Sequence, residues 1–298
     1  MTQNLRTRIG ETLSLPLRPE VRAYAQRLGE DAGALAVLFY GSNLRTGSLD
    51  GVLDFYVLLP GPQRERMWPR VSYREWVPEG DTLRAKIATM SLAKFTEAAA
   101  GQSTDTTIWT RFVQPSALAW SRDRGAAEKV TDAITQAACT ASRFAAVLGP
   151  DTGKAEDFWR ALFQATYRAE FRVEKPGRED SILTVNASHF DGLLPLAWEA
   201  AGIPFSRTNG QLAPDLSAKV EADLCAQWKR RERLGKPLNI LRLAKATTTF
   251  DGAARYGAWK LERHTGIALE VTPFRERHPL LAMPGAAWEL WRARRAQR

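Results

Sequence analysis

Two short apolar runs separated by a turn-rich stretch constrain the fold of this chain more than any other feature. Residues 34–40 and 52–59 have the length and composition of buried strands, and the first run ends at Gly41 and Ser42. Asp54 lies inside the second run, where a carboxylate is costly unless it is paired or binds a metal ion. We therefore expect two neighbouring strands, a Gly-Ser turn after the first, and a functional carboxylate at Asp54. A buried structural aspartate that caps a loop is the simpler alternative.

The remaining pattern changes character near residue 123. Two more strand candidates, residues 82–90 and 116–120, precede this point, and a short helical pattern covers 21–28. Apolar residues at helical spacing dominate afterwards, in segments 126–148, 155–173, 182–201 and 216–234, and again from 239 to 265 after Pro237. The sequence predicts an α+β protein with a mixed-sheet domain at 1–124, an all-helical second domain at 125–275 and a C-terminal segment at 276–298.

A strand, a Gly-Ser turn and then an aspartate in the next strand is the layout of the nucleotidyltransferase fold. Glycine lets the backbone approach a triphosphate, and the Ser42 hydroxyl suits a phosphate oxygen. Asp54 then has the position to hold Mg²⁺ between the phosphates. Many proteins of this fold carry a second carboxylate two residues later, but that position is Tyr56 here. The missing ligand is expected from Asp50, Asp81 or another part of the chain, unless the domain has lost its catalysis.

The charge balance favours anionic partners. The formal net charge is +9, which suits nucleic acid, nucleotide phosphates or an acidic lipid surface, although a solvated basic face also accounts for it. No apolar run approaches the ~20 residues that span a bilayer, and the first residues do not resemble a secretory signal. The C-terminal residues place Trp288 and Trp291 three apart among arginines, which indicates an amphipathic helix at a membrane surface or one packed on the core.

Residues 39–42 and 53–58 together resemble the mitochondrial-type phosphatidate cytidylyltransferase family, also called the translocator assembly and maintenance family. Its members carry a Tyr-Gly-Ser turn and then a lone Asp in an apolar strand. Similar segments follow in the same order at 83–87, 111–115, 167–172 and 242–252. Asn43 departs from the glycine that is usual there. The resemblance implies a nucleotidyltransferase domain, a winged-helix-like second domain that closes the cleft, and transfer of CMP from CTP to phosphatidic acid with Mg²⁺.

The motif positions and the resemblance together give a set of candidate residues. Three of the roles given below have a simpler alternative: Glu170 could be a solvated helix carboxylate, Arg111 a surface arginine, and the basic residues near 242 an ordinary basic helix face. The candidates are Asp54 and Lys86 for catalysis; Tyr40, Gly41, Ser42 and Arg111 for the nucleotide; Asp54, Asp50 and Glu170 for the metal; and Arg172, Arg242, Lys245 and Thr247 for the substrate phosphate.

Two other functional classes remain open at this point. The first is a nucleotidyltransferase that acts on RNA, a sugar or a protein, and the second is a non-enzymatic nucleic-acid binder. The three histidines show no metal spacing and no general-base pattern, which is consistent with an acceptor phosphate that is already anionic. The aromatic residues do not interleave with basic residues in a nucleic-acid-binding motif, so no nucleic-acid partner is expected. The sequence therefore favours a cytoplasmic protein, peripherally associated with the inner face of the membrane.

Overall fold

The computed structural model describes residues 4–78, 80, 82–170, 178–249, 251–265, 270–277, 285 and 288. Strands and helices alternate in the first part of the chain, and helices predominate in the second. The strands are β1 (Ala36–Tyr40), β2 (Leu53–Leu59), β3 (Arg70–Trp76), β4 (Leu83–Ser91), β5 (Ser116–Ser121), β6 (Phe205–Thr208) and β7 (Gln211–Pro214). The helices are α1 (Leu5–Leu13), α2 (Pro19–Asp31), α3 (Ser42–Thr46), α4 (Leu92–Ala99), α5 (Thr107–Phe112), α6 (Arg124–Leu148), α7 (Ala155–Glu170), α8 (Arg178–Val185), α9 (Ala187–Phe190), α10 (Leu193–Ala201), α11 (Ala218–Thr249), α12 (Ala253–Thr265) and α13 (Pro273–Arg277).

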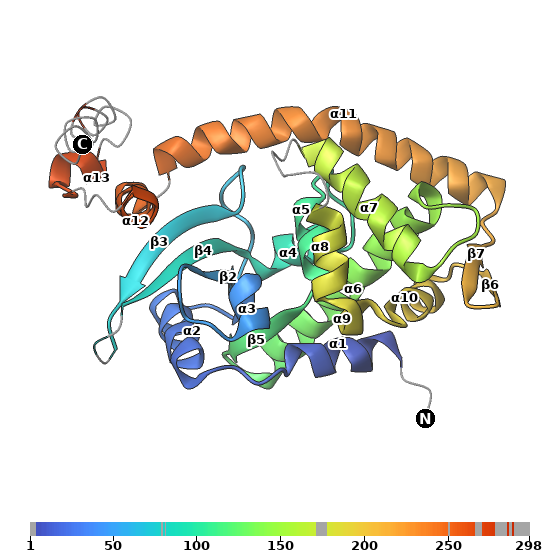
Figure 1. The fold of residues 1–298 in the computed structure, drawn as a ribbon, viewed down its shortest axis with the longest axis horizontal. Helices are drawn as coiled ribbons and strands as arrows, with labels where there is room; N and C mark the ends of the chain where they lie inside the picture. Colours follow the sequence, from blue (N-terminus) through green and yellow to red (C-terminus); the bar gives the residue numbers. More distant parts are fainter. Residues whose placement is uncertain are drawn as a thin grey trace.

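A five-stranded mixed sheet organises the first part of the chain (Figure 1). Its strand order is β3-β4-β2-β1-β5. β2 and β4 are parallel, whereas the other neighbouring pairs are antiparallel. The sheet confirms the predicted α+β class and all four strand candidates. β3 was not predicted, because its alternation is half polar, as suits a strand at the edge of a sheet.

Side-chain alternation along the strands divides the core between the two faces of the sheet. Phe39 and Phe55 point to one face, where they pack with Tyr24 of α2. Tyr56 and Leu58 point to the opposite face, into a larger core that includes residues of α4, α5 and α6. This larger core continues without a break into the helices that follow α6. α6 begins at Arg124, where the Asp123 side chain caps its first turn, and the division into domains at this residue stays a prediction.

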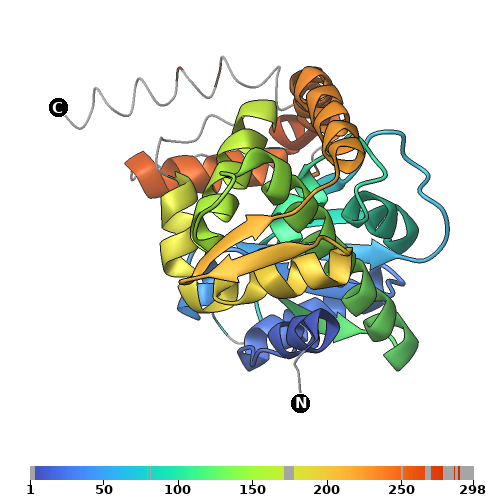
Figure 2. The ribbon, with the colours of Figure 1, turned by 90° about the vertical axis from the view of Figure 1, so that its right-hand side faces the viewer.

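The second half of the chain is not all helical, so that expectation was wrong. β6 and β7 form an antiparallel hairpin that lies against α10, with the Phe205 ring 5.4 Å from that of Trp198 (Figure 2). The turn consists of Asn209 and Gly210, which both have positive φ values of 51° and 77°. This Asn-Gly pair is the preferred sequence for such a two-residue hairpin turn, and it was a readable signal.

The expected interruption of the last long helix at Pro237 was also wrong. α11 continues through Pro237 as far as Thr249 and passes over α7 along the top of the molecule in Figure 1. Proline removes one backbone donor from a helix, but packing can hold the helix together across that position. Here Gly235 lies so close to α7 that an added Cβ would be 2.4 Å from the carbonyl oxygen of Ala169. This close contact between helices supplies the packing.

Two further sequence expectations concern membranes. Among the described helices, none has both the length and the apolar character needed to cross a bilayer. The predicted C-terminal segment, 276–298, falls outside the described residues, with the exception of Glu276, Arg277, Gly285 and Trp288. Its role at a membrane surface therefore stays a prediction.

Candidate functional site

Three of the predicted residues form one row across the central strands. Asp54 of β2 is the register partner of Tyr40 on antiparallel β1 and of Lys86 on parallel β4. Directly paired residues on neighbouring strands project from the same face of a sheet. This is the face that carries Tyr56 and Leu58, so the row extends the surface of the larger core at the end where β1 stops.

The turn after β1 is shaped to fit Asp54. Gly41 has φ 94° and ψ −162°, a conformation that side-chain-bearing residues rarely adopt, and an added Cβ would lie 3.1 Å from the Asp54 Oδ2 atom. Ser42 follows at the exposed start of α3. The Asn43 amide donates hydrogen bonds of 2.9 Å to the carbonyl oxygens of Ser48 and Asp50. A glycine at position 43 would lack these bonds, so Asn43 is the residue that fixes this loop.

The Asp54 carboxylate has no hydrogen-bond or ion-pair partner among the described residues, although it is half-buried. Burial raises the pKa of the Asp54 carboxyl group, and the charges of Lys86 and Arg111 oppose that rise. Lys86 retains solvent contact, yet the surrounding protein desolvates its ammonium group and lowers its pKa, and Asp54 opposes this effect. A carboxylate with nearby cations but no direct partner is a typical feature of a binding site.

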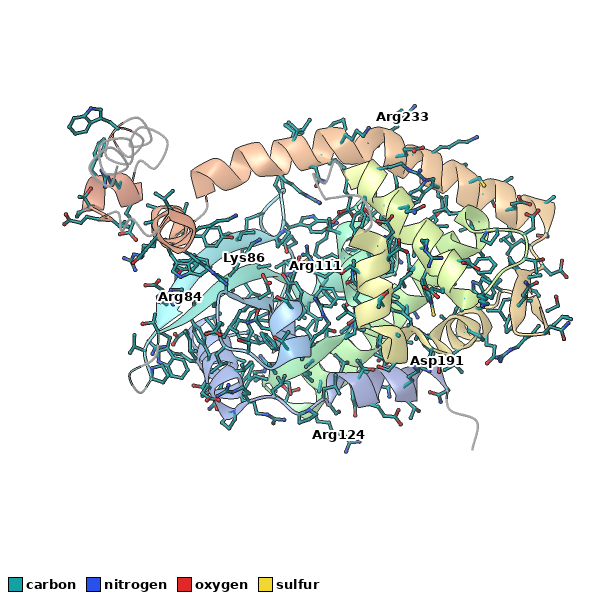
Figure 3. The ribbon with its side chains drawn as sticks, viewed as in Figure 1. Arg84, Lys86, Arg111, Arg124, Asp191 and Arg233 are labelled. Carbon is teal, nitrogen blue, oxygen red and sulfur yellow. The ribbon has the colours of Figure 1, made fainter. Side chains whose placement is uncertain are left out.

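Arg111, labelled near Lys86 in Figure 3, packs against both tyrosines of this region. Its guanidinium carbon is 5.2 Å from the ring centroid of Tyr40 and 5.7 Å from that of Tyr56, and its Nη1 atom donates a 3.1 Å hydrogen bond to the Tyr56 hydroxyl. Burial opposes the charge on Arg111. The surrounding tyrosine and carboxyl groups outweigh burial and raise its pKa, so Arg111 remains a cation. The tyrosine that replaces a second carboxylate thus holds a positive charge near Asp54.

Glu170 and Arg242 belong to a polar cluster behind Arg111. Glu170 is 3% exposed, accepts a hydrogen bond from the Thr106 hydroxyl and contributes to the raised pKa of Arg111. It is therefore not a solvated carboxylate. Arg242 forms a 2.9 Å ion pair with the buried Asp105 and stacks over Trp68 at 4.7 Å. Its guanidinium group is already engaged, which weakens its candidacy as a free phosphate ligand.

The other candidates are less directly placed. The Asp50 carboxylate accepts a 3.2 Å hydrogen bond from Ser48 at an exposed position of the turn. Lys245 and Thr247 lie on α11, but their side chains, together with the whole of Asp81 and Arg172, fall outside the described residues. In the part of the chain that the structure describes, no three acidic, histidine or cysteine side chains gather as a metal cluster.

One carboxylate nevertheless fits the requirements of Mg²⁺ in a phosphate-transfer site. This ion is commonly held by one or two carboxylates, with substrate phosphates and water completing its octahedron. The half-buried, unpartnered carboxylate of Asp54 supplies such a ligand. Lys86 and Arg111 suit the anionic phosphates that would supply the others.

Sequence reasoning missed the contribution of α12, which packs against β3. Lys260 of this helix lies close enough to Lys86 to affect its pKa, and Arg263 reaches the turn that precedes β2. Both residues lie in a segment that had been predicted as helix. Their spacing with Tyr256 and Trp259 was visible in the sequence, but no local signal indicated which surface this helix would contact.

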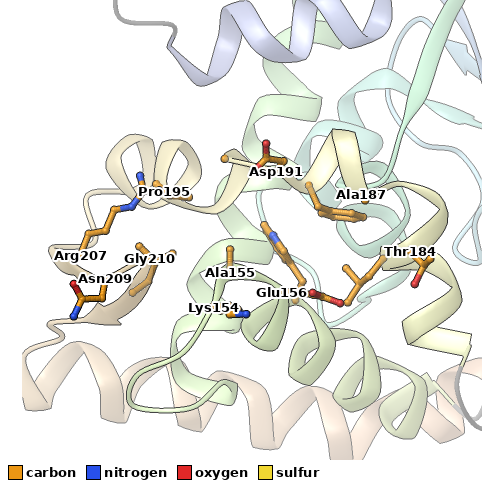
Figure 4. Close-up of a pocket in the computed structure, with 15 residues that line it drawn as sticks. Lys154, Ala155, Glu156, Thr184, Ala187, Asp191, Pro195, Arg207, Asn209 and Gly210 are labelled. Carbon is orange, nitrogen blue, oxygen red and sulfur yellow. The ribbon is translucent and has the colours of Figure 1, made fainter.

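A separate cavity of about 390 Å³ lies in the helical half (Figure 4). Its lining includes the apolar side chains of Trp159, Phe190 and Leu212, and the charged residues Lys154 and Arg207. None of the predicted site residues lines this cavity. The row at Asp54, not this cavity, is therefore the candidate functional site.

No protein-family model matches this chain, and no curated protein matches it. The functional assignment therefore depends on the resemblance of short motifs and on the chemistry of the site.

Proposed function

We propose that this protein is a nucleotidyltransferase that transfers CMP from CTP to phosphatidic acid, giving CDP-diacylglycerol and pyrophosphate. The observation that carries the proposal is the unpartnered Asp54 carboxylate, fitted against Gly41 and accompanied by Lys86 and Arg111. One anionic ligand for a cation beside two cations for phosphates is the arrangement that a metal–nucleotide complex requires. It supports the nucleotidyltransferase interpretation of the mixed sheet, whereas the winged-helix interpretation of the second half depends on the family resemblance alone.

The reaction needs positioning and charge neutralisation more than proton transfer. A phosphate oxygen of phosphatidic acid attacks the α-phosphorus of CTP, the bond between that phosphorus and the bridging oxygen breaks, and pyrophosphate leaves with the electron pair. The attacking oxygen is already anionic, so no general base is needed. The His189 imidazole is engaged with the Val113 carbonyl oxygen at 2.8 Å, away from this role.

Each residue of the row then has a distinct task. Asp54 would hold Mg²⁺, which would neutralise charge on the phosphates as a Lewis acid. Lys86 and Arg111 bind phosphate oxygens through charge-assisted hydrogen bonds. Gly41 leaves room for the carboxylate, and the Tyr40 ring holds the Arg111 guanidinium in place. The predicted C-terminal amphipathic segment would bring the site to the lipid surface.

The decisive experiment measures lipid-extractable label and pyrophosphate with each nucleoside triphosphate in turn. The purified protein is incubated with Mg²⁺ and phosphatidic acid in detergent micelles, and Asp54→Asn is compared with the wild type. Asp31→Asn serves as the control, because Asp31 is an exposed carboxylate in a surface pair with Arg27. We expect CTP-specific labelling that Asp54→Asn abolishes and Asp31→Asn leaves unchanged.

The same assay separates the alternatives. Absence of turnover by a folded wild-type protein, with every nucleotide tested, would refute the lipid assignment. Labelling of RNA, a sugar or a protein instead of the lipid would retain the transferase and change its acceptor. Glu170→Gln and Asp50→Asn, titrated with Mg²⁺, then test the two predicted additional ligands, since loss of a ligand raises the Mg²⁺ concentration required for half-maximal rate.

A further inference from the structure

One face of α12 carries two aromatic and two basic side chains. Tyr256, Trp259, Lys260 and Arg263 follow the i, i+3, i+4, i+7 spacing that aligns side chains along one side of a helix. Each of these side chains contacts the sheet region or another member of the set. The two aromatic side chains of this face pack against the sheet region, whereas Lys260 and Arg263 are exposed to solvent at its edge.

The start of α12 is fixed to the edge of the sheet. The Asp251 carbonyl oxygen accepts a 2.8 Å hydrogen bond from the Tyr73 amide of β3, and the Asp251 carboxylate pairs with Arg74 at 2.6 Å. Gly252 follows with φ 82°, so close to β3 that an added Cβ would lie 2.6 Å from the Tyr73 carbonyl oxygen. These contacts determine where α12 begins, beside β3 in Figure 1.

Aromatic stacking then sets the direction of the helix across the strands. The Tyr256 ring lies 5.5 Å from that of Tyr73, which is the register partner of Lys86. Trp259 contacts two guanidinium groups, with Arg84 at 5.7 Å and Arg263 at 5.5 Å from its ring centroid. The helix is thus anchored to both β3 and β4.

The two basic residues of this face reach two places beside the Asp54 row. Lys260, whose ammonium group is 5.9 Å from the Tyr256 ring centroid, lies on the side of Lys86. Arg263 reaches the turn before β2, where its Nη1 atom is 3.0 Å from the position of a Cβ added at Gly51. A helix about 200 residues beyond Asp54 in the sequence therefore brings two cations to the site.

The resulting balance of charge is strongly positive. Lys86, Arg111, Lys260 and Arg263 form no ion pair with any described residue, and Asp54 is the unpartnered carboxylate among them. Lys260 lies over the Tyr256 ring, and that ring contacts Tyr73, the register partner of Lys86, so the like charges of Lys260 and Lys86 lie near one another. An anion that contacts several of these groups would relieve the repulsion.

We propose that Lys260 and Arg263 bind phosphates of the nucleotide, so that α12 completes the polyphosphate site from the side of β3 and β4. The inference rests on the proposed function and deepens it, because it assigns the triphosphate to a surface formed by β4, α5 and α12 together. Several cations distributed over three elements suit an extended polyanion better than a single phosphate. Tripolyphosphate should therefore bind more tightly than orthophosphate.

The test is calorimetric titration of the full-length protein with inorganic tripolyphosphate and Mg²⁺. We expect Lys260→Met to raise the Kd at least about tenfold, the loss typical of a charge-assisted hydrogen bond, and Lys260→Arg to retain most of the affinity. Arg263→Met should weaken binding in the same direction. Lys219→Met is the matched control, because it removes an exposed lysine at the far end of α11 (Figure 1).

The outcomes separate this inference from the proposed function. If the wild type binds tripolyphosphate and Lys260→Met binds it equally well, α12 is not part of the site and the inference fails alone. If the wild type binds no polyphosphate, both fail. If binding depends on Lys260 but no nucleotide is turned over, the inference stands and the proposed reaction fails.

Discussion

Replacing Gly41 with alanine tests how closely the turn after β1 is fitted to the Asp54 carboxylate. The φ of 94° and ψ of −162° at this position belong to a region that is essentially restricted to glycine. The added methyl group would also lie 3.1 Å from the Asp54 Oδ2 atom. We therefore expect the substitution to affect both stability and the position of the carboxylate.

The magnitude follows from comparison with Gly47, a second glycine of the same region. Gly47 has φ 66° and ψ 4°, and an added Cβ would meet no atom within 4 Å. Alanine in this left-handed conformation costs ~1–2 kcal/mol, and the ~0.4–1 kcal/mol gained from the reduced entropy of the unfolded chain applies to both variants and cancels in the comparison. Backbone strain at Gly41 costs about 1–3 kcal/mol, and the contact with the carboxylate adds to it. Gly41→Ala should therefore be the less stable variant, by roughly 1 kcal/mol.

Urea denaturation measures the free energies of unfolding of both variants, and the transfer assay measures their activity. Gly41→Ala should lose at least about tenfold in rate, because small displacements of a positioned group are costly, whereas Gly47→Ala should remain active. Equal stability and equal activity of the two variants would refute the fit between Gly41 and Asp54.

Three further substitutions probe other parts of the structure. Burial lowers the pKa of His189 to about 4 from an ordinary value of 6.5. The stability contributed by the neutral histidine is therefore fully present above about pH 6.5, and up to about 3 kcal/mol of it is lost as the pH falls through 4. Urea denaturation at several pH values should show a smaller loss of stability at low pH for His189→Gln, and an equal loss in both proteins would show that His189 is not its cause. Arg111→Lys keeps the charge but loses the planar stacking and the hydrogen bond to Tyr56, so the Kd for tripolyphosphate should rise about tenfold by calorimetry, and an unchanged Kd would exclude a geometric role. Gly29→Ala would place a Cβ 2.3 Å from the Trp120 ring and should lower the free energy of unfolding by about 1–3 kcal/mol, whereas unchanged stability would show that this ring moves freely.

The strands around the site could be predicted because their signals are local. Apolar runs bounded by Gly, Ser, Asn and Pro located β1 and β2 to within two residues at each end. The edge strand β3 has too polar an alternation for that signal. The hairpin turn at Asn209 and Gly210 carried a clear signal that the surrounding helical pattern obscured.

In α11, by contrast, a strong local signal was present but led to a wrong prediction. Pro237 is a strong local signal for a helix end, but α11 continues through it because Gly235 allows close packing on α7. Tertiary packing outweighed local propensity at this position. The engagement of Arg242 by Asp105 is a similar case, because the two residues are far apart in sequence and no spacing rule connects them.

The sequence by itself determined the alternation that puts Asp54 on the same face as Tyr56, and the glycine that lets the preceding turn approach it. These are properties of neighbouring residues, set by backbone sterics and by the period of a strand. Only the tertiary structure decided that Lys86 is the register partner of Asp54, that Arg111 packs against two tyrosines, and that α12 reaches the same place. Parallel pairing and helix packing join segments that are distant in the chain, and the energy that selects them comes from burial of the whole core and not from any local pattern.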